Sequence, residues 1–156
     1  VGTFLLAYNG HSRFQAVSSK IAAAAAFGIA LAPTVAACDS STAISLAHDA
    51  SAGLLFGVLV YFCVVFCLRA KSKGKIMRAG FYGFCGIVIS GAMLSAFFVQ
   101  QWCSCAWWSE RRIVYYVEWV ALWAFGFAWL TAGTYQLRDG VKDKVGATLA
   151  EWREKP

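Results

Sequence analysis

The sequence predicts an all-α membrane protein, a bundle of four full membrane-spanning helices preceded by the end of a further helix. Hydrophobic residues make up 60% of the 156 positions and charged residues only 14%. The mean hydropathy is +0.59, which is typical of multispan helical proteins rather than of soluble domains. The apolar residues form long runs separated by polar segments. A transmembrane β-barrel would instead show segments of about 10 residues with alternating polarity.

The chain begins with an apolar segment, residues 1–8, that is too short to cross a bilayer. Because it lacks an initiating Met and the charged start of a signal peptide, we interpret it as the end of a truncated earlier span. A polar loop should follow, and the first full span is predicted at 18–37. Its alanines permit close helix contact and favour a central position in the bundle. Pro33 is expected to end this helix, since proline lacks a backbone N–H.

The second and third spans are predicted at 50–68 and 79–100, with a basic connector at 69–78 between them. Cys63 and Cys67 lie on one face of the second span, four residues apart. Two helical thiols without further ligands make a poor metal site, so we expect them to pack as small apolar side chains. Small residues in the third span should let a neighbouring backbone approach closely. These are Gly80, Gly83 and Gly86.

The fourth span is predicted at 113–137 and completes a helical membrane domain over residues 1–137. Residues 138–156 should form a separate amphipathic tail, because apolar side chains recur there at helical spacing among basic ones. We expect the tail to lie on the membrane surface or to dock on a partner. Its apolar stripe consists of Val141, Val145, Leu149 and Trp152.

The distribution of basic residues predicts the orientation of the bundle. Of the 14 Lys and Arg residues, all but Arg111 and Arg112 fall in the segment before the first span, in the 69–78 connector or after the fourth span. The positive-inside rule places those three segments in the cytoplasm. The other two loops, and the start of the fourth span, should therefore face the outer side of the membrane.

Three cysteines fall in these two outer loops: Cys38, Cys103 and Cys105. In an oxidising compartment they favour a structural disulfide between the loops, although free thiols are an alternative. A third alternative is a thiol-exchange enzyme similar to the disulfide-bond-forming or vitamin K epoxide reductase membrane proteins. Those families carry a Cys-x-x-Cys motif, whereas this chain has Cys-Ser-Cys. No metal site is expected, because the second loop offers only two cysteines and no histidine.

Glu118 is the carboxylate inside the fourth span, about 8 Å from its predicted start. An ionisable group near the centre of a span costs about 2.5–3.5 kcal/mol, so Glu118 should be neutralised or paired. His48 and Asp49 are predicted at a similar depth, and a contact between His48 and Glu118 would satisfy the carboxylate. The three residues form either a structural polar contact or a proton, ion or ligand pocket. Haem is excluded as a ligand of this site, because His11 lies on the opposite side from His48.

Several short patterns resemble a family of small bacterial multispan membrane proteins, distantly similar to the autophagy-modulator (DRAM-like) group. The first is Ile29-Ala30-Leu31-Ala32-Pro33 closing a small-residue helix, with His48 opening the next. The third helix contributes Arg78, Tyr82, Cys85 and Gly86, and the last contributes Glu118, Gly126 and Trp129 within EWVALWAFGFAWLTAG. The resemblance covers about residues 4–133 and implies a bacterial inner-membrane location and a further N-terminal helix. It implies no reaction.

The sequence shows no nucleophile–base pair, catalytic carboxylate pair, cofactor fingerprint or metal cluster. We therefore expect a non-enzymatic accessory, structural or assembly subunit of a larger membrane complex, with no cofactor of its own. Its partners would be membrane lipids and other membrane subunits, and no nucleic acid. One alternative is a lipid or small-molecule binding or transport protein that uses an outer pocket at Glu118. A second is a membrane thiol-disulfide oxidoreductase.

Overall fold

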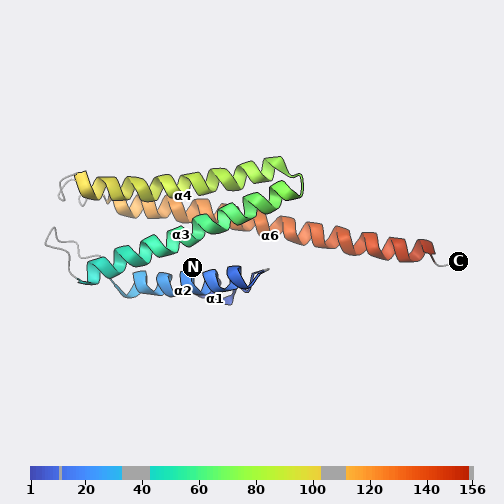
Figure 1. Cartoon of the computed structure of the whole chain (residues 1–156), viewed down its shortest axis with the longest axis horizontal. Helices are drawn as coiled ribbons and strands as arrows, with labels where there is room; N and C mark the ends of the chain where they lie inside the picture. The colour runs from blue at the N-terminus through green and yellow to red at the C-terminus, as the bar shows by residue number, and fades with distance from the viewer. Residues whose placement is uncertain (11, 33–42, 103–111, 155–156) are drawn as a thin grey trace.

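The computed structural model of the chain describes all residues except 11, 33–42, 103–111 and 155–156. The described residues form helices and no strand, in the order shown in Figure 1. Four helices are long and apolar enough to cross a membrane, which confirms the predicted all-α transmembrane bundle. The helices are α1 (Gly2–Ala7), α2 (Arg13–Leu31), α3 (Ala43–Ser72), α4 (Ile76–Trp102) and α6 (Ile113–Glu154).

Helix α2 begins and ends earlier in the chain than the sequence predicted. Ser12 caps its N-terminus, where the Ser12 hydroxyl accepts a hydrogen bond from the Gln15 backbone N–H at 3.3 Å. The helix ends at Leu31, and Ala32 is extended, as expected for a residue that precedes a proline. The observed helix therefore lies about one and a half helical turns earlier in the chain than the predicted span of 18–37.

Helices α3 and α4 are longer than predicted and meet at a tight turn. Helix α3 continues into the basic connector as far as Ser72, and α4 begins within the connector at Ile76. Gly74 lies in the turn with a φ of +68°, a conformation that glycine adopts without steric cost. At its other end α3 begins at Ala43, so His48 and Asp49 lie within the helix rather than before it.

Helix α6 is one continuous helix of 42 residues, about 63 Å long at 1.5 Å per residue. The predicted boundary at residues 137 and 138 is not a break in the helix, and residues Ile113–Tyr135 within it are long and apolar enough to cross a membrane. The remainder extends beyond the bundle (Figure 1). Val141 and Val145 are exposed there, whereas the side chains of Leu149 and Trp152 lie outside the described set. Docking of this segment stays a prediction.

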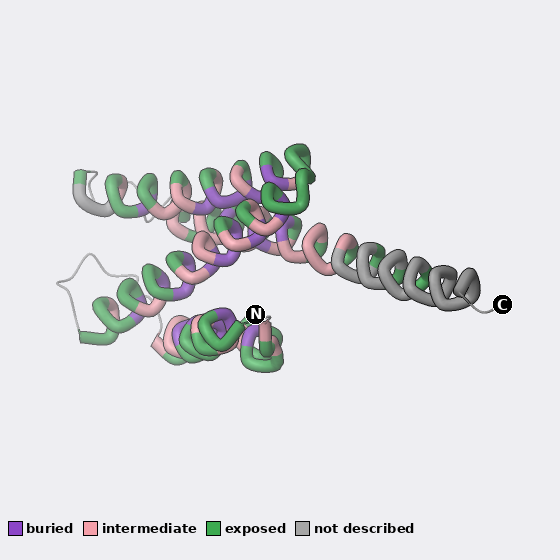
Figure 2. Tube along the Cα trace, turned by 45° about the vertical axis from the view of Figure 1, so that its right-hand side comes forward, coloured by how far each residue is buried: buried purple, intermediate pink, exposed green. Residues whose placement is uncertain are grey.

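Helix α3 is the centre of the bundle, because it packs against α2, α4 and α6. The sequence placed the alanine-rich helix α2 at the centre, and that prediction was wrong: α2 packs against α1 and α3 only. Figure 2 shows the buried residues gathered where α3, α4 and α6 cross. Small residues do permit close contact, since a Cβ on Gly28 would lie 2.6 Å from the Ser51 Oγ.

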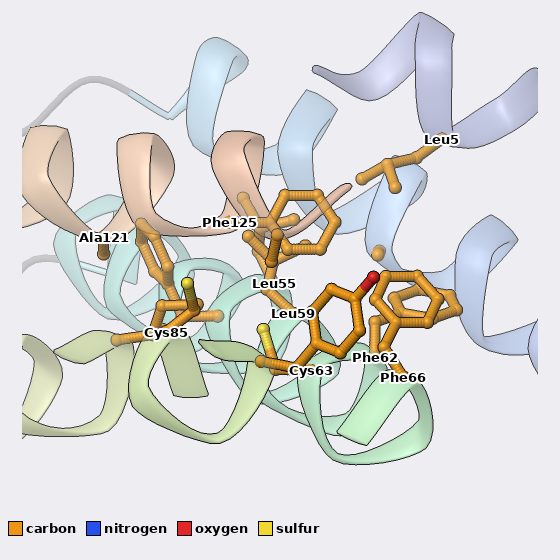
Figure 3. Close-up of a cluster of buried hydrophobic side chains, with 14 of the residues drawn as sticks. Leu5, Leu55, Leu59, Phe62, Cys63, Phe66, Cys85, Ala121 and Phe125 are labelled. Atoms are coloured by element: carbon orange, nitrogen blue, oxygen red, sulfur yellow. The ribbon is translucent and has the colours of Figure 1, made fainter. Parts of the chain in front are cut away.

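The core between α3, α4 and α6 contains both aromatic rings and thiols (Figure 3). Cys63 is fully buried against the open face of Gly86, where an added Cβ would lie 3.4 Å from the Cys63 Cβ. This confirms apolar packing of Cys63, and close approach at Gly86. A Cβ on Gly80 would meet nothing within 4 Å, so the expected close approach does not extend there.

The short helix α1 is tied to α2 through its last carbonyl groups. The Ser19 hydroxyl donates to the Leu5 carbonyl, and the Lys20 ammonium donates to the Leu6 carbonyl. The Leu5 side chain is completely buried. The Leu5 carbonyl also accepts the backbone N–H of Tyr8 at 3.3 Å. The two side-chain contacts from α2 therefore hold α1 against the bundle.

Candidate functional site

His48 and Glu118 meet near the ends of α3 and α6 that lie opposite the basic α3–α4 turn (Figure 1). Each residue lies five positions after the start of its helix, so both have risen about 8 Å along it. The His48 Nε2 is 3.9 Å from the Glu118 Oε1. The structure therefore brings together the two residues that the sequence placed at the same depth.

The C-terminal end of α2 orients the His48 ring. Its Nδ1 is 2.8 Å from the Ala32 carbonyl oxygen. A carbonyl only accepts hydrogen bonds, so Nδ1 carries a proton and donates it to Ala32. No sequence pattern predicts this contact, because a backbone carbonyl at the end of another helix has no sequence signature.

The second ring nitrogen of His48 has no hydrogen-bond partner among the described residues, although it is buried. His48 as a whole is 7% exposed. With Nδ1 protonated, a neutral ring would direct the Nε2 lone pair at the Glu118 carboxylate, so two acceptors would face each other. A proton on either group removes that repulsion and supplies a donor.

An open pocket of about 360 Å³ adjoins this pair, between α1, α2, α3 and α6. Among the described residues, Glu118 is the one carboxylate that lines it, and 27% of its side chain is exposed. The other described lining residues are apolar or small, apart from the hydroxyl of Thr3. They are Val1, Gly2, Thr3, Ala26, Phe27, Ile29, Ala30, Leu55, Phe56 and Leu122.

Asp49 takes no direct part in the pocket wall. It is exposed on α3, next to His48, and its negative charge acts on Glu118 through space. Because Asp49 adds a second negative charge near Glu118, a positive charge placed beside Glu118 would be stabilised more strongly. The predicted group of three is therefore one close pair, His48 and Glu118, with Asp49 as a neighbouring charge.

The predicted disulfide residues Cys38, Cys103 and Cys105 lie outside the described residues. The described cysteines, Cys63, Cys67 and Cys85, are free. Within the described ranges, no group of three or more His, Cys, Asp or Glu side chains is arranged to hold a metal ion.

The comparisons with known proteins do not assign this site. No protein-family profile, curated protein or solved structure matches the chain. The resemblance to the bacterial multispan family therefore stays a prediction from the sequence motifs, and the function is argued from the site itself.

Proposed function

We propose that this integral membrane protein binds a lipid or another small amphiphile in the pocket between α1, α2, α3 and α6. The observation that supports this most is Glu118, a carboxylate placed in the wall of an otherwise apolar, open pocket. Ligand pockets typically have volumes of about 300–1,000 Å³ and apolar walls with a few polar groups that fix the ligand's orientation. This pocket has both properties.

A purely structural role explains the exposure of Glu118 and its distance from His48 less well than ligand binding does. A carboxylate kept only for helix packing would be expected to make its hydrogen bonds within the helix interface. Glu118 instead keeps 27% of its side chain exposed, at a distance of 3.9 Å from the His48 Nε2. Glu118 therefore retains hydrogen-bonding capacity in the wall of a pocket that a ligand can enter.

The pocket lies toward the outer leaflet in the orientation that we propose. The α3–α4 turn carries exposed Lys71, Lys73 and Lys75 at the end of the bundle opposite His48 and Glu118 (Figure 1). Basic residues favour the cytoplasmic side of a membrane. A lipid or amphiphile would then enter sideways from the outer leaflet.

The same geometry gives no comparable support to the other two hypotheses. The thiol oxidoreductase hypothesis depends on Cys38, Cys103 and Cys105, which lie outside the described residues. The accessory-subunit hypothesis follows from the lack of catalytic motifs in the sequence, and its candidate docking surface is the apolar stripe of the C-terminal segment, where Val141 is 60% exposed and Val145 is 53% exposed. Those two valines are equally compatible with a membrane surface.

Filling the pocket is expected to abolish binding without unfolding the protein. Ala30 lines the pocket and is exposed, so Ala30→Trp should occupy the space with an indole ring. We expect 1-decanol to bind at least about tenfold more weakly, equivalent to about 1.4 kcal/mol. The measurement is a scintillation proximity titration with tritiated 1-decanol on immobilised protein in mild detergent.

Ala24→Trp is the matched control, because Ala24 is also an exposed alanine of α2 but does not line the pocket. It should bind 1-decanol as the wild type does. If both variants lost binding equally, or if Ala30→Trp bound normally, this pocket would not be the binding site.

A further inference from the structure

We infer that the ligand of this pocket carries a cationic head group, and that this cation replaces a proton held between His48 and Glu118. The inference rests on the proposed binding function and specifies the chemistry of the ligand. It has two independent supports, which are the charge of the pocket wall and the unpartnered nitrogen of His48.

The pocket wall favours a cation over an anion. Glu118 is the charged side chain that reaches it, and no Lys or Arg is among the described lining residues. An anionic amphiphile would bring a second negative charge to Glu118, whereas an ammonium group would pair with it. Phe27 and Phe56 also line the pocket, and aromatic rings attract organic cations through their π faces.

The buried nitrogen of His48 indicates what occupies the site without a ligand. Nδ1 is fixed as a donor to the Ala32 carbonyl, and Nε2 faces Glu118 with no described hydrogen-bond partner. One proton on the pair makes it a neutral unit, either as imidazolium and carboxylate or as imidazole and carboxylic acid. An apolar environment favours such a neutral unit over a net charge.

The exchange conserves charge at the site. In the proton-loaded state the pair of His48 and Glu118 has no net charge. When the cation binds the Glu118 carboxylate, the proton leaves to the solvent and His48 becomes a neutral imidazole that still donates from Nδ1. The site again has no net charge. Addition of the cation without loss of the proton would leave a positive charge in an apolar pocket, which burial disfavours.

Among the described residues, two ionisable side chains act on Glu118. From α3 these are His48 and Asp49, both of which act on Glu118 electrostatically. The described pocket residues of α1 and α2 carry no ionisable side chain, and Val1, which precedes α1, also lines the wall. Asp49 is exposed and does not line the pocket, so His48 and Glu118 are the pair that exchanges the proton.

The test compares a permanent cation with a neutral probe over a range of pH. Octyltrimethylammonium keeps its charge at every pH, and 1-decanol is uncharged and of similar length. At low pH, where the pair holds its proton, we expect the apparent Kd for the cation to fall about tenfold per pH unit increase, because one proton is released for each cation bound. At higher pH it should level off, and 1-decanol binding should not change with pH.

Two variants identify the groups responsible. Glu118→Gln keeps the shape of the side chain but removes the charge, so the apparent Kd for octyltrimethylammonium should rise and should no longer change with pH. Asp49→Asn should retain the tenfold dependence. A pH indicator in weakly buffered solution should record release of one proton per bound cation in the wild type, and none in Glu118→Gln.

The outcomes separate this inference from the function on which it rests. Binding of octyltrimethylammonium that is independent of pH, or unchanged in Glu118→Gln, would overturn the exchange. Binding of 1-decanol alone would overturn the cationic ligand class and leave the pocket intact. If neither probe bound, or if Ala30→Trp affected neither, the proposed function itself would be wrong.

Discussion

Replacing Trp129 with alanine is expected to lower the free energy of unfolding by about 3 kcal/mol, the low end of the usual cost of removing a large aromatic side chain from a core, because Trp129 is partly buried and packs against the core cluster. The Trp129 ring lies where α1, α3 and α6 converge, with ring centroids 4.6 Å from Tyr8 and 5.6 Å from Phe62. Its truncation would leave a cavity that several rigid rings cannot close. The remaining ring neighbours of Trp129 are Phe4, Phe66 and Phe125.

Trp123→Ala provides the matched control for this prediction. Trp123 lies on the same helix but is 51% exposed, and its described ring contacts are to Trp119 and Phe127 of α6 itself. We expect a loss of less than about 1 kcal/mol there. Unfolding by SDS titration from mild detergent, followed by circular dichroism, measures both variants. Equal losses would show that Trp129 is not the centre of the core.

Replacing His48 with alanine is expected to destabilise the protein by about 2–3 kcal/mol. The change removes the donor to the Ala32 carbonyl and leaves Glu118 without its partner. Breaking a fully buried ion pair costs about 3–5 kcal/mol, and the smaller figure reflects the 27% exposure of Glu118. The same detergent-to-SDS titration measures the loss.

A double-mutant cycle isolates the part of this loss that belongs to the pair. In the background of Glu118→Gln, His48→Ala should cost less than in the wild type, by about 1 kcal/mol or more, because residues in contact do not contribute independently. With Asp49→Asn as the background, the cost of His48→Ala should be nearly unchanged. Additive losses for His48 and Glu118 would contradict the pairing.

The bundle was predictable because membrane spans depend on the length and composition of local segments. The ends of α2 were not, because they depend on contacts made elsewhere in the fold. The sequence predicts Gln15 in a polar loop and Ser19 at the polar start of a span, yet both are buried. Gln15 accepts a hydrogen bond from the Tyr8 hydroxyl at 3.4 Å, and Ser19 donates to the Leu5 carbonyl. Polarity alone could not reveal these partners.

The candidate site was predictable only in part. The sequence predicts a special role for Glu118, because placing a carboxylate within a membrane span costs free energy. The similar depth of His48 along its helix was enough to suggest it as the partner. The walls of the pocket come from Phe27 and Ala30 on α2 and from α1. Nothing distinguishes these residues from ordinary core or lipid-facing side chains until the helices are placed in space. The Ala32 carbonyl was likewise invisible in the sequence.

The central claim is that this pocket holds a ligand, and photolabelling tests it most directly. A 1-decanol analogue with a diazirine group would be irradiated with the full chain in a bilayer, and the labelled residues mapped by mass spectrometry. We predict labels concentrated on Phe27, Ile29 and Leu122, which line the pocket, and reduced by excess unlabelled 1-decanol. Uniform labelling of exposed residues outside the pocket, such as Ile87 and Trp123, with no competition, would contradict the claim.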